Sequence, residues 1–240
     1  MEATRICIWS GPRNISTALM YAFAQRQDTE VFDEPLYAHY LRVSGAQHPG
    51  RDQVLQTQEQ DGEKVVRDQI LGPATKPVLF FKQMAHHLVE LDESFLDRVV
   101  NVFLIRDPSL VLASFSKVIP HPALGDIGIA RQYELYQQLK EQGQDPLVID
   151  GPELLKNPEA VLRSLCEKLR LAFEPAMLTW EAGPIPQDGV WAPYWYANVH
   201  QSTGFQPYQP KTVALRPDLQ AVAQQAAPFY TSLFDAALKA

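Results

Sequence analysis

A run of hydroxyl and cationic side chains lies near the start of the chain, at residues 10–17 (SGPRNIST). The preceding apolar stretch at residues 5–9 predicts a buried strand, and the apolar spacing of residues 15–26 predicts a helix that follows at once. Backbone N–H groups that converge at the N-terminus of a helix bind phosphate or sulfate, and an arginine such as Arg13 holds an oxyanion through two hydrogen bonds. The run therefore predicts a P-loop-like strand-loop-helix anion site.

The run differs from a standard nucleotide-binding P-loop. That loop reads GxxxxGK[ST], which, counted from Gly11, requires Gly-Lys-Ser/Thr at residues 16–18. The chain has Ser16, Thr17 and Ala18 there, so it lacks both the phosphate-binding lysine and the hydroxyl that binds magnesium. An ordinary P-loop NTPase is therefore disfavoured. Ser16 and Thr17 either bind an anion or, in a simpler interpretation, only cap the helix.

A second candidate anion site follows the clearest predicted strand, at residues 99–105. Arg106 comes directly after it, Asp107 and Pro108 are typical of a helix start, and Ser114 lies eight residues beyond Arg106. A strand end and the first turns of the next helix fold back on each other, so the guanidinium and the hydroxyl could share one phosphate. The simpler interpretation is a surface Arg106–Asp107 pair, with Ser114 an ordinary helix residue.

Together the two motifs resemble those of PAPS-dependent sulfotransferases, over about residues 5–170. The family's 5′-phosphosulfate loop typically reads Pro-Lys/Arg-Ser-Gly-Thr-Thr, and residues 12–17 (PRNIST) match it at the proline, the cation and the two hydroxyls. They depart from it at Asn14 and at Ile15, which replaces a glycine. A glycine needed for a positive φ would not be replaced cheaply by isoleucine, so a differently shaped loop is expected.

The resemblance implies a sulfotransferase that moves a sulfuryl group from PAPS to a hydroxyl or amine of a small molecule and releases PAP. Arg106 and Ser114 match the family's 3′-phosphate site. The 5′-phosphosulfate would then be held by the residues of the first loop, Arg13, Asn14, Ser16 and Thr17.

The resemblance also indicates the catalytic groups. Lys82 ends the third predicted strand, where many members have Lys-Thr-His with the histidine as base, but Met84 occupies the histidine position here. Glu34, after the second predicted strand, matches the glutamate base of other branches, so Glu34, Lys82 and Arg13 are the expected catalytic residues. Glu34 could also be part of a solvated acidic turn. His86 and His87 are alternative bases, although surface or capping positions suit them better.

A late segment at residues 173–217 is rich in proline, tryptophan and tyrosine and has no periodicity. A loop of that length inside a compact domain usually serves as a lid or binding segment. Thr203 and Gly204 are its counterpart to the family loop that closes over the nucleotide, unless they form an ordinary turn. Its aromatic residues either line an acceptor pocket or attach the segment to the core.

Strands and helices alternate along the chain. Further strands are expected at residues 30–32, 77–81 and 147–149, and further helices at residues 52–60, 62–70, 127–142, 157–169 and 217–237. This order predicts an α/β fold with a mainly parallel sheet and helices on both faces. At 240 residues we expect a single sulfotransferase-like domain spanning residues 1–240.

Composition excludes several other classes. A net charge of −7 argues against nucleic-acid or membrane-surface binding, and no apolar run approaches the roughly 18 residues that span a bilayer. Two isolated cysteines and scattered histidines predict no metal site, and without a signal peptide a cytoplasmic setting fits best. Two alternatives stay open: a nucleotide- or phosphate-binding protein without activity, and a divergent phosphotransferase that needs ATP and Mg²⁺. The acceptor and the oligomeric state are not indicated.

Overall fold

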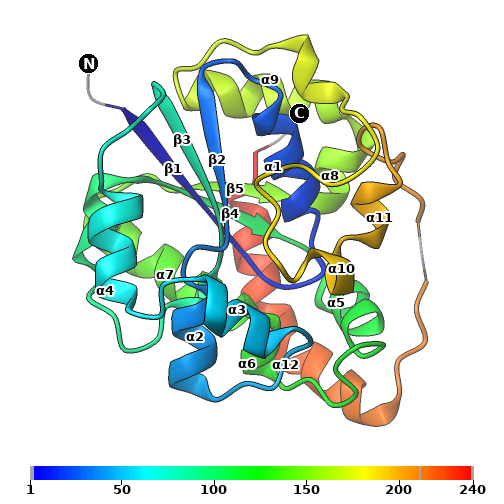
Figure 1. Cartoon of the computed structure of the whole chain (residues 1–240). Coiled ribbons are helices and arrows are strands. Elements are labelled where there is room, and N and C mark those ends of the chain that lie inside the picture. The colour runs from blue at the N-terminus through cyan, green and yellow to red at the C-terminus, as the bar shows by residue number, and fades with distance from the viewer. Residues whose placement is uncertain (1–2, 211, 239–240) are drawn as a thin grey trace. The chain divides into compact units, whose positions relative to one another are not determined.

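The computed structural model describes residues 3–210 and 212–238 (Figure 1). It contains a five-stranded sheet in the order β2-β3-β1-β4-β5, in which β2 pairs with β3 and β4 with β5 in parallel. The strands are β1 (Thr4–Ser10), β2 (Thr29–Asp33), β3 (Val78–Met84), β4 (Val100–Ile105) and β5 (Leu147–Asp150). The predicted α/β fold, with a parallel sheet and helices around it, is confirmed.

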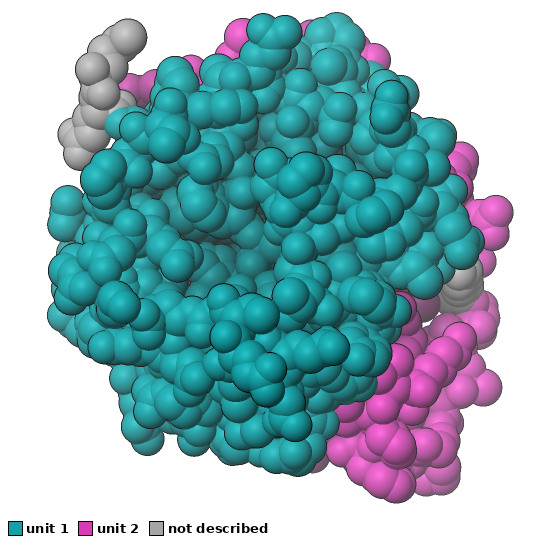
Figure 2. All heavy atoms as spheres, viewed as in Figure 1, with its two compact units in different colours: residues 1–8, 16–101, 174–205 teal, residues 9–15, 102–173, 206–240 magenta. Residues whose placement is uncertain are grey.

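The chain forms two compact units, coloured separately in Figure 2. Unit 1 comprises residues 1–8, 16–101 and 174–205, and unit 2 comprises residues 9–15, 102–173 and 206–240. Each unit is assembled from three separate stretches of chain. The loop at residues 9–15 belongs to unit 2, whereas the helix that follows it along the chain belongs to unit 1.

Unit 1 is built around the paired strands β2 and β3, whose register places Asp33 opposite Lys82. Helix α1 (Ser16–Ala24) packs against both strands. The other helical elements are α2 (Tyr37–Ser44), α3 (Arg51–Thr57), α4 (Gly62–Val65), η1 (Val66–Ile70), η2 (Ala85–His87), η3 (Glu93–Arg98), η4 (Pro175–Leu178), α10 (Ala192–Trp195) and α11 (Ala197–His200).

Unit 2 contains the paired strands β4 and β5, and its last helix packs against two earlier ones. Helix α12 (Pro217–Asp235) contacts α5 (Pro108–Phe115) and α7 (Ile129–Glu141). The remaining helices are α6 (Leu124–Ile127), α8 (Gly151–Lys156) and α9 (Pro158–Lys168). The predicted start of α5 is confirmed, because the Asp107 carboxylate caps it by accepting from the Ser109 and Leu110 N–H groups.

Some helices form where the sequence pattern did not predict one, and α2 is an example. Five of the eight residues in its sequence, YAHYLRVS, are tyrosine, histidine, valine or serine, which are only moderate helix formers. Its buried face instead packs in a core cluster with residues of the late segment, including Trp191 and Tyr196. Tertiary packing therefore stabilises α2 more than intrinsic propensity does. Helix α8 was likewise not expected, and the helix expected at residues 62–70 is divided into α4 and the π-helix η1.

The late segment contains more regular structure than its composition suggests. It includes η4, α10 and α11, and Thr179 and Gly204 form an antiparallel bridge. Trp180 and Trp191 are 5% and 2% exposed, so these tryptophans attach the segment to the core of unit 1. In the described part of the chain, no helix is both long enough and apolar enough to cross a membrane.

Candidate active site

The first loop has a left-handed residue, but it is Arg13 and not Ile15. Arg13 has φ of 56°, whereas Ile15 adopts an ordinary backbone conformation. A non-glycine residue in this region is strained by roughly 1–3 kcal/mol, and such strain is concentrated at functional sites. The loop is therefore shaped differently from one that depends on glycine at position 15, and isoleucine is tolerated there.

Two further residues hold the loop in place inside unit 2. A Cβ on Gly11 would lie 2.2 Å from the Ile127 carbonyl oxygen, so only glycine permits this close approach. The Asn14 side chain donates to the Leu104 carbonyl over 2.7 Å and accepts from the Ile15 N–H over 2.9 Å. The Asn14 amide thus connects the loop to the end of β4, and its expected role in binding the cofactor stays a prediction.

The two predicted anion motifs meet in unit 2. Arg13 Nε donates to Ser114 Oγ over 3.1 Å, and Arg106 Nη1 donates to the Arg13 carbonyl over 2.6 Å. Arg13 and Ser114 are 101 residues apart in sequence, so the fold brings together groups that the sequence could only pair by analogy. The alternative of an isolated Arg106–Asp107 surface pair does not describe this arrangement, because Asp107 is engaged in capping α5.

The electrostatics of this arginine cluster favour an anion. Burial lowers the pKa of Arg106, and the positive charge of Arg13 lowers it further. Burial also lowers the pKa of Arg13. Across residues 3–210 and 212–238, no carboxylate lies within ion-pair distance of Arg106; Asp107 and Asp150 act on it only from farther away. A bound dianion would supply the missing negative charge.

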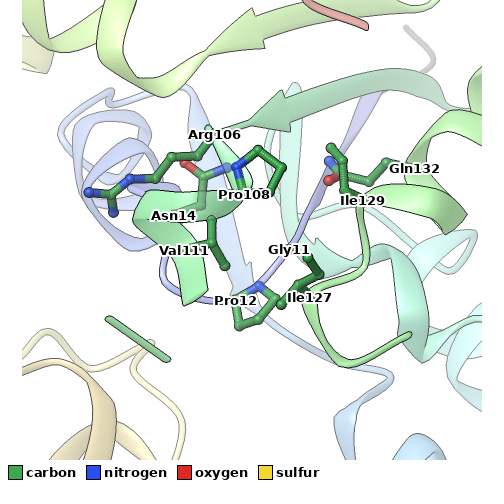
Figure 3. Close-up of a pocket in the computed structure, with 9 residues that line it drawn as sticks. All are labelled: Gly11, Pro12, Asn14, Arg106, Pro108, Val111, Ile127, Ile129 and Gln132. Carbon is green, nitrogen blue, oxygen red and sulfur yellow. The ribbon is translucent and has the colours of Figure 1, made fainter. Parts of the chain in front are cut away.

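A small pocket in unit 2 lies beside the loop (Figure 3). Its volume of about 10 Å³ has room for about one water molecule. Gln132 donates from Nε2 to the Trp9 and Leu104 carbonyls, and the Arg106 side chain extends away from Gly11 and Ile127. This pocket therefore lies against the loop and is too small to hold a nucleotide.

Unit 1 contains a second cluster, which is buried and ionic. Lys82 Nζ donates to Asp33 Oδ1 over 2.8 Å, to Glu34 Oε1, and to the Tyr196 hydroxyl over 2.7 Å. The Lys82 side chain is 1% exposed. Strand β3 continues to Met84, so Lys82 lies inside the strand and not at its end as expected. The Asp33–Lys82 register brings the two side chains together.

Glu34 directly follows β2, and its carboxyl is buried beside a cation, Lys82, and a second carboxylate, Asp33. Burial raises the pKa of Glu34 above its ordinary value; Lys82 opposes this effect and the like charge of Asp33 adds to it. The residue has φ of 44°, a strained left-handed conformation, and it is 6% exposed. The alternative of a solvated acidic turn is therefore wrong, since Glu34 is buried against Lys82.

His86 and His87 were expected at the surface; His87 is instead buried, whereas His86 is partly exposed. His87 is 1% exposed and is stacked between the rings of Tyr37 and Tyr40. Burial lowers the pKa of His86 to about 3 and places that of His87 well below its ordinary value. Imidazoles of such low basicity are poor general bases near neutral pH, which favours Glu34. Among the described residues, no group of three or more histidine, cysteine or acidic side chains is arranged to bind a metal.

The late segment contributes groups that the sequence did not single out. Tyr196 donates to Asp33 and accepts from Trp191 Nε1 over 2.9 Å, so it belongs to the ionic cluster of unit 1. Only its place in an aromatic-rich run marked it beforehand. Thr203 and Gly204 also lie in unit 1, where the backbone carbonyl of Thr203 accepts a hydrogen bond from the Trp180 backbone N–H. A Cβ on Gly204 would lie 2.8 Å from the Leu178 carbonyl oxygen, so the Thr179 bridge accounts for this glycine.

Comparison with known proteins agrees with the fold and the motifs. Residues 4–237 match the sulfotransferase domain family, so the chain belongs to that family. It is similar in structure to the sulfotransferase domain from the curacin biosynthetic pathway (TM-score 0.51, 17% identity, covering 94% of this chain and 98% of that one). A sulfotransferase from Alicyclobacillus acidocaldarius gives a TM-score of 0.53 at 12% identity and covers 99% and 98% of the two chains. At such identities these two likenesses establish the fold alone.

Two Arabidopsis thaliana proteins are much closer in sequence. They are the branched-chain-amino-acid aminotransferase-like proteins 1 and 2, 48% and 46% identical to this chain over 198 residues, or 82% of its length. The chain spans only 36% and 35% of these relatives. Their names describe proteins more than twice as long as this chain, and the part they share with it overlaps its sulfotransferase domain.

Proposed function

We propose that this protein transfers a sulfuryl group from PAPS to a hydroxyl or amine of a small molecule. The observation that carries the proposal is the meeting of Arg13, Arg106 and Ser114 in unit 2, with no carboxylate paired to Arg106 within the described residues. PAPS carries several phosphate and sulfate oxyanions, which are the ligands that such a cluster selects. Arg106 and Ser114 would bind its 3′-phosphate.

The loop residues would bind the other end of the donor. Arg13, Ser16 and Thr17 would hold the 5′-phosphosulfate at the start of α1, while Asn14 keeps the loop in shape. PAPS supplies the sulfuryl group as a mixed anhydride and leaves as PAP. Thr203 and Gly204 stay a prediction as the residues that close over the nucleotide.

The ionic cluster of unit 1 would provide acid–base chemistry. Glu34 would accept the proton that the acceptor hydroxyl or amine loses as it bonds to sulfur, and a carboxyl with a raised pKa suits that role. Arg13 would stabilise charge on the transferring group. All three N–H groups of Lys82 are already donated to protein acceptors, so its contribution would be positive charge and not a new hydrogen bond.

The first test is a calorimetric titration with PAP, beside ADP and ATP. We expect PAP to bind more tightly than ADP, and Arg106→Ala to weaken PAP binding about ten- to a hundred-fold, the size of a lost charge-assisted hydrogen bond. Arg163→Ala is the matched control, because Arg163 forms an exposed ion pair with Glu159 on α9 of the same unit. Equal affinities for PAP and ADP would contradict the assignment of the 3′-phosphate site.

The second test measures transfer from ³⁵S-labelled PAPS to a panel of phenols, alcohols and amines. With any acceptor that is labelled, Glu34→Gln should reduce turnover about 10²–10⁴-fold and leave PAP affinity nearly unchanged, because the amide cannot take a proton. Undiminished turnover would remove Glu34 as the base. Transfer that continues in EDTA would exclude a magnesium-dependent phosphotransferase.

One observation favours a second candidate, a protein that binds nucleotides without catalysing transfer. Lys82 has no N–H left to donate, and Met84 occupies the position of the family's histidine base. Under this alternative, PAP would bind as expected, but no acceptor of the panel would be labelled.

A further inference from the structure

In the buried ionic cluster of unit 1, every hydrogen-bond donor of the cation has an acceptor. A lysine ammonium has three N–H donors, and Lys82 gives one each to Asp33, Glu34 and Tyr196. A buried ammonium is stable only when its charge and its donors are matched in this way. Neither acceptor carboxylate can change without affecting the other, because both share the same cation.

The Tyr196 hydroxyl is saturated as well. A hydroxyl has one donor and two acceptor sites, and this one donates to the Asp33 carboxylate while it accepts from Lys82 and from Trp191 Nε1. The distances to the Asp33 oxygens are 2.8 and 2.9 Å. Tyr196 and Trp191 both come from the late segment, so that segment completes the cluster formed by β2 and β3.

The carboxylates of Asp33 and Glu34 accept different numbers of hydrogen bonds. Asp33 accepts from Lys82, from Tyr196, and from the Gly189 N–H over 3.0 Å. Among the described residues, the Glu34 carboxylate accepts only from Lys82. One cation cannot neutralise two carboxylates, and hydrogen bonds to a carboxylate stabilise its charged form. Asp33, with three donors, is therefore the better-stabilised partner of Lys82, and Glu34 has only the one donor.

We propose that Tyr196 is a positioning residue, which fixes Asp33 as the counter-ion of Lys82 and so reserves Glu34 for proton exchange with the acceptor. The assignment of Glu34 to the acceptor rests on the proposed function; the division of roles between the two carboxylates does not. The aromatic late segment thus determines which acidic residue after β2 exchanges a proton.

The surroundings of Glu34 agree with this division. Burial raises the pKa of Glu34, and Asp33 adds to the effect. The titratable and charged groups around the cluster come from the elements packed against it: Asp33 from β2, Lys82 from β3, Tyr21 from α1, Tyr37 from α2, His87 from η2, and Tyr196. Of the hydroxyl groups among these, that of Tyr196 donates a hydrogen bond to Asp33, so it acts on the two carboxylates unequally.

The test measures the titration of Glu34 directly. The ¹³C resonance of its side-chain carboxyl is assigned by its absence in Glu34→Gln and followed against pH, with no substrate present. Tyr196→Phe removes only the hydroxyl, so Asp33 loses a donor and Lys82 turns more fully to Glu34. We expect the midpoint of Glu34 to move toward lower pH by about 0.5–1 pH unit, the size of one hydrogen bond. Asp33→Asn should move it further in the same direction.

The matched control is Tyr230→Phe. Tyr230 also donates its hydroxyl to a carboxylate, that of Asp150 in unit 2, over 2.9 Å, so its loss removes the same kind of hydrogen bond without touching the cluster. The midpoint of Glu34 should be the same in this variant as in the parent. An unmoved midpoint in both Tyr196→Phe and Asp33→Asn, or an equal shift in Tyr230→Phe, would overturn the proposal. A selective shift in a protein that labels no acceptor would support the division of roles and reject the sulfotransferase function.

Discussion

The arginine cluster of unit 2 and the lysine cluster of unit 1 solve the problem of buried charge in opposite ways. Arg106 is half-buried beside a second cation, and within the described residues it lacks a carboxylate partner. Lys82 is fully buried, and two carboxylates and a hydroxyl take up all its donors. Among the described residues, Arg106 has no paired carboxylate, whereas Lys82 has two.

This difference indicates that the two clusters have different roles, one in binding an anion and the other in holding side chains in place. A protein tolerates uncompensated cations at a partly exposed place where an anionic ligand will supply the charge. It does not tolerate an uncompensated cation in its core, so the residues around Lys82 must match it in every state. We therefore expect the arginine cluster to govern affinity, and the lysine cluster to govern stability and proton exchange.

The largest expected effect is on stability, when the central cation of each cluster is replaced by methionine. Lys82→Met should destabilise the protein by about 3–5 kcal/mol, because it leaves two buried carboxylates without a counter-ion. Arg106→Met should change stability by about 1 kcal/mol or less, since relief from Arg13 offsets the lost hydrogen bond. Urea unfolding of the two variants measures the contrast. Equal losses would show that the arginine cluster is structural.

A smaller effect concerns a third kind of group, the partly buried histidine His86. The folded-state pKa of His86 is about 3 against an ordinary value of 6.5, so the unfolded chain binds one more proton between these pH values. Stability should therefore fall as the pH decreases through that window, by about 1.4 kcal/mol per pH unit from His86 alone. In His86→Gln the slope of unfolding free energy against pH should be smaller by that amount. Parallel slopes in parent and variant would contradict the low pKa.

The smallest effect tests the loop itself. Asn14→Ala removes two hydrogen bonds and should lower stability by about 1–2 kcal/mol, and it should also weaken PAP binding because the loop loses its shape. Asn101→Ala is the matched control, since the buried Asn101 amide donates to the Leu96 carbonyl in unit 1. That variant should lose similar stability and keep its PAP affinity. Weakened binding in both would mean that general destabilisation, not loop shape, is responsible.

Much of the fold was predictable because its signals are local. Asp107 and Pro108 start a helix through contacts with the next few residues, and the apolar stretch before them is a buried strand wherever it packs. Helix α2 was not predictable, because its stability comes from distant aromatic residues of the late segment. The same limit applied to His86 and His87, whose rings contact those of Tyr37 and Tyr40.

The candidate site divides along the same line. Arg13, Arg106 and Ser114 could be selected from residue types and spacing, since an anion site needs cations and hydroxyls after strands in a set order. Residue type also pointed to Glu34 and Lys82. Only the folded chain shows that Asn14 holds the loop, that Arg13 carries its strain, and that Tyr196 joins Asp33 and Lys82 across more than a hundred residues. Hydrogen-bond saturation and buried charge depend on which residues are neighbours in space, and the order of residues along the chain does not show this.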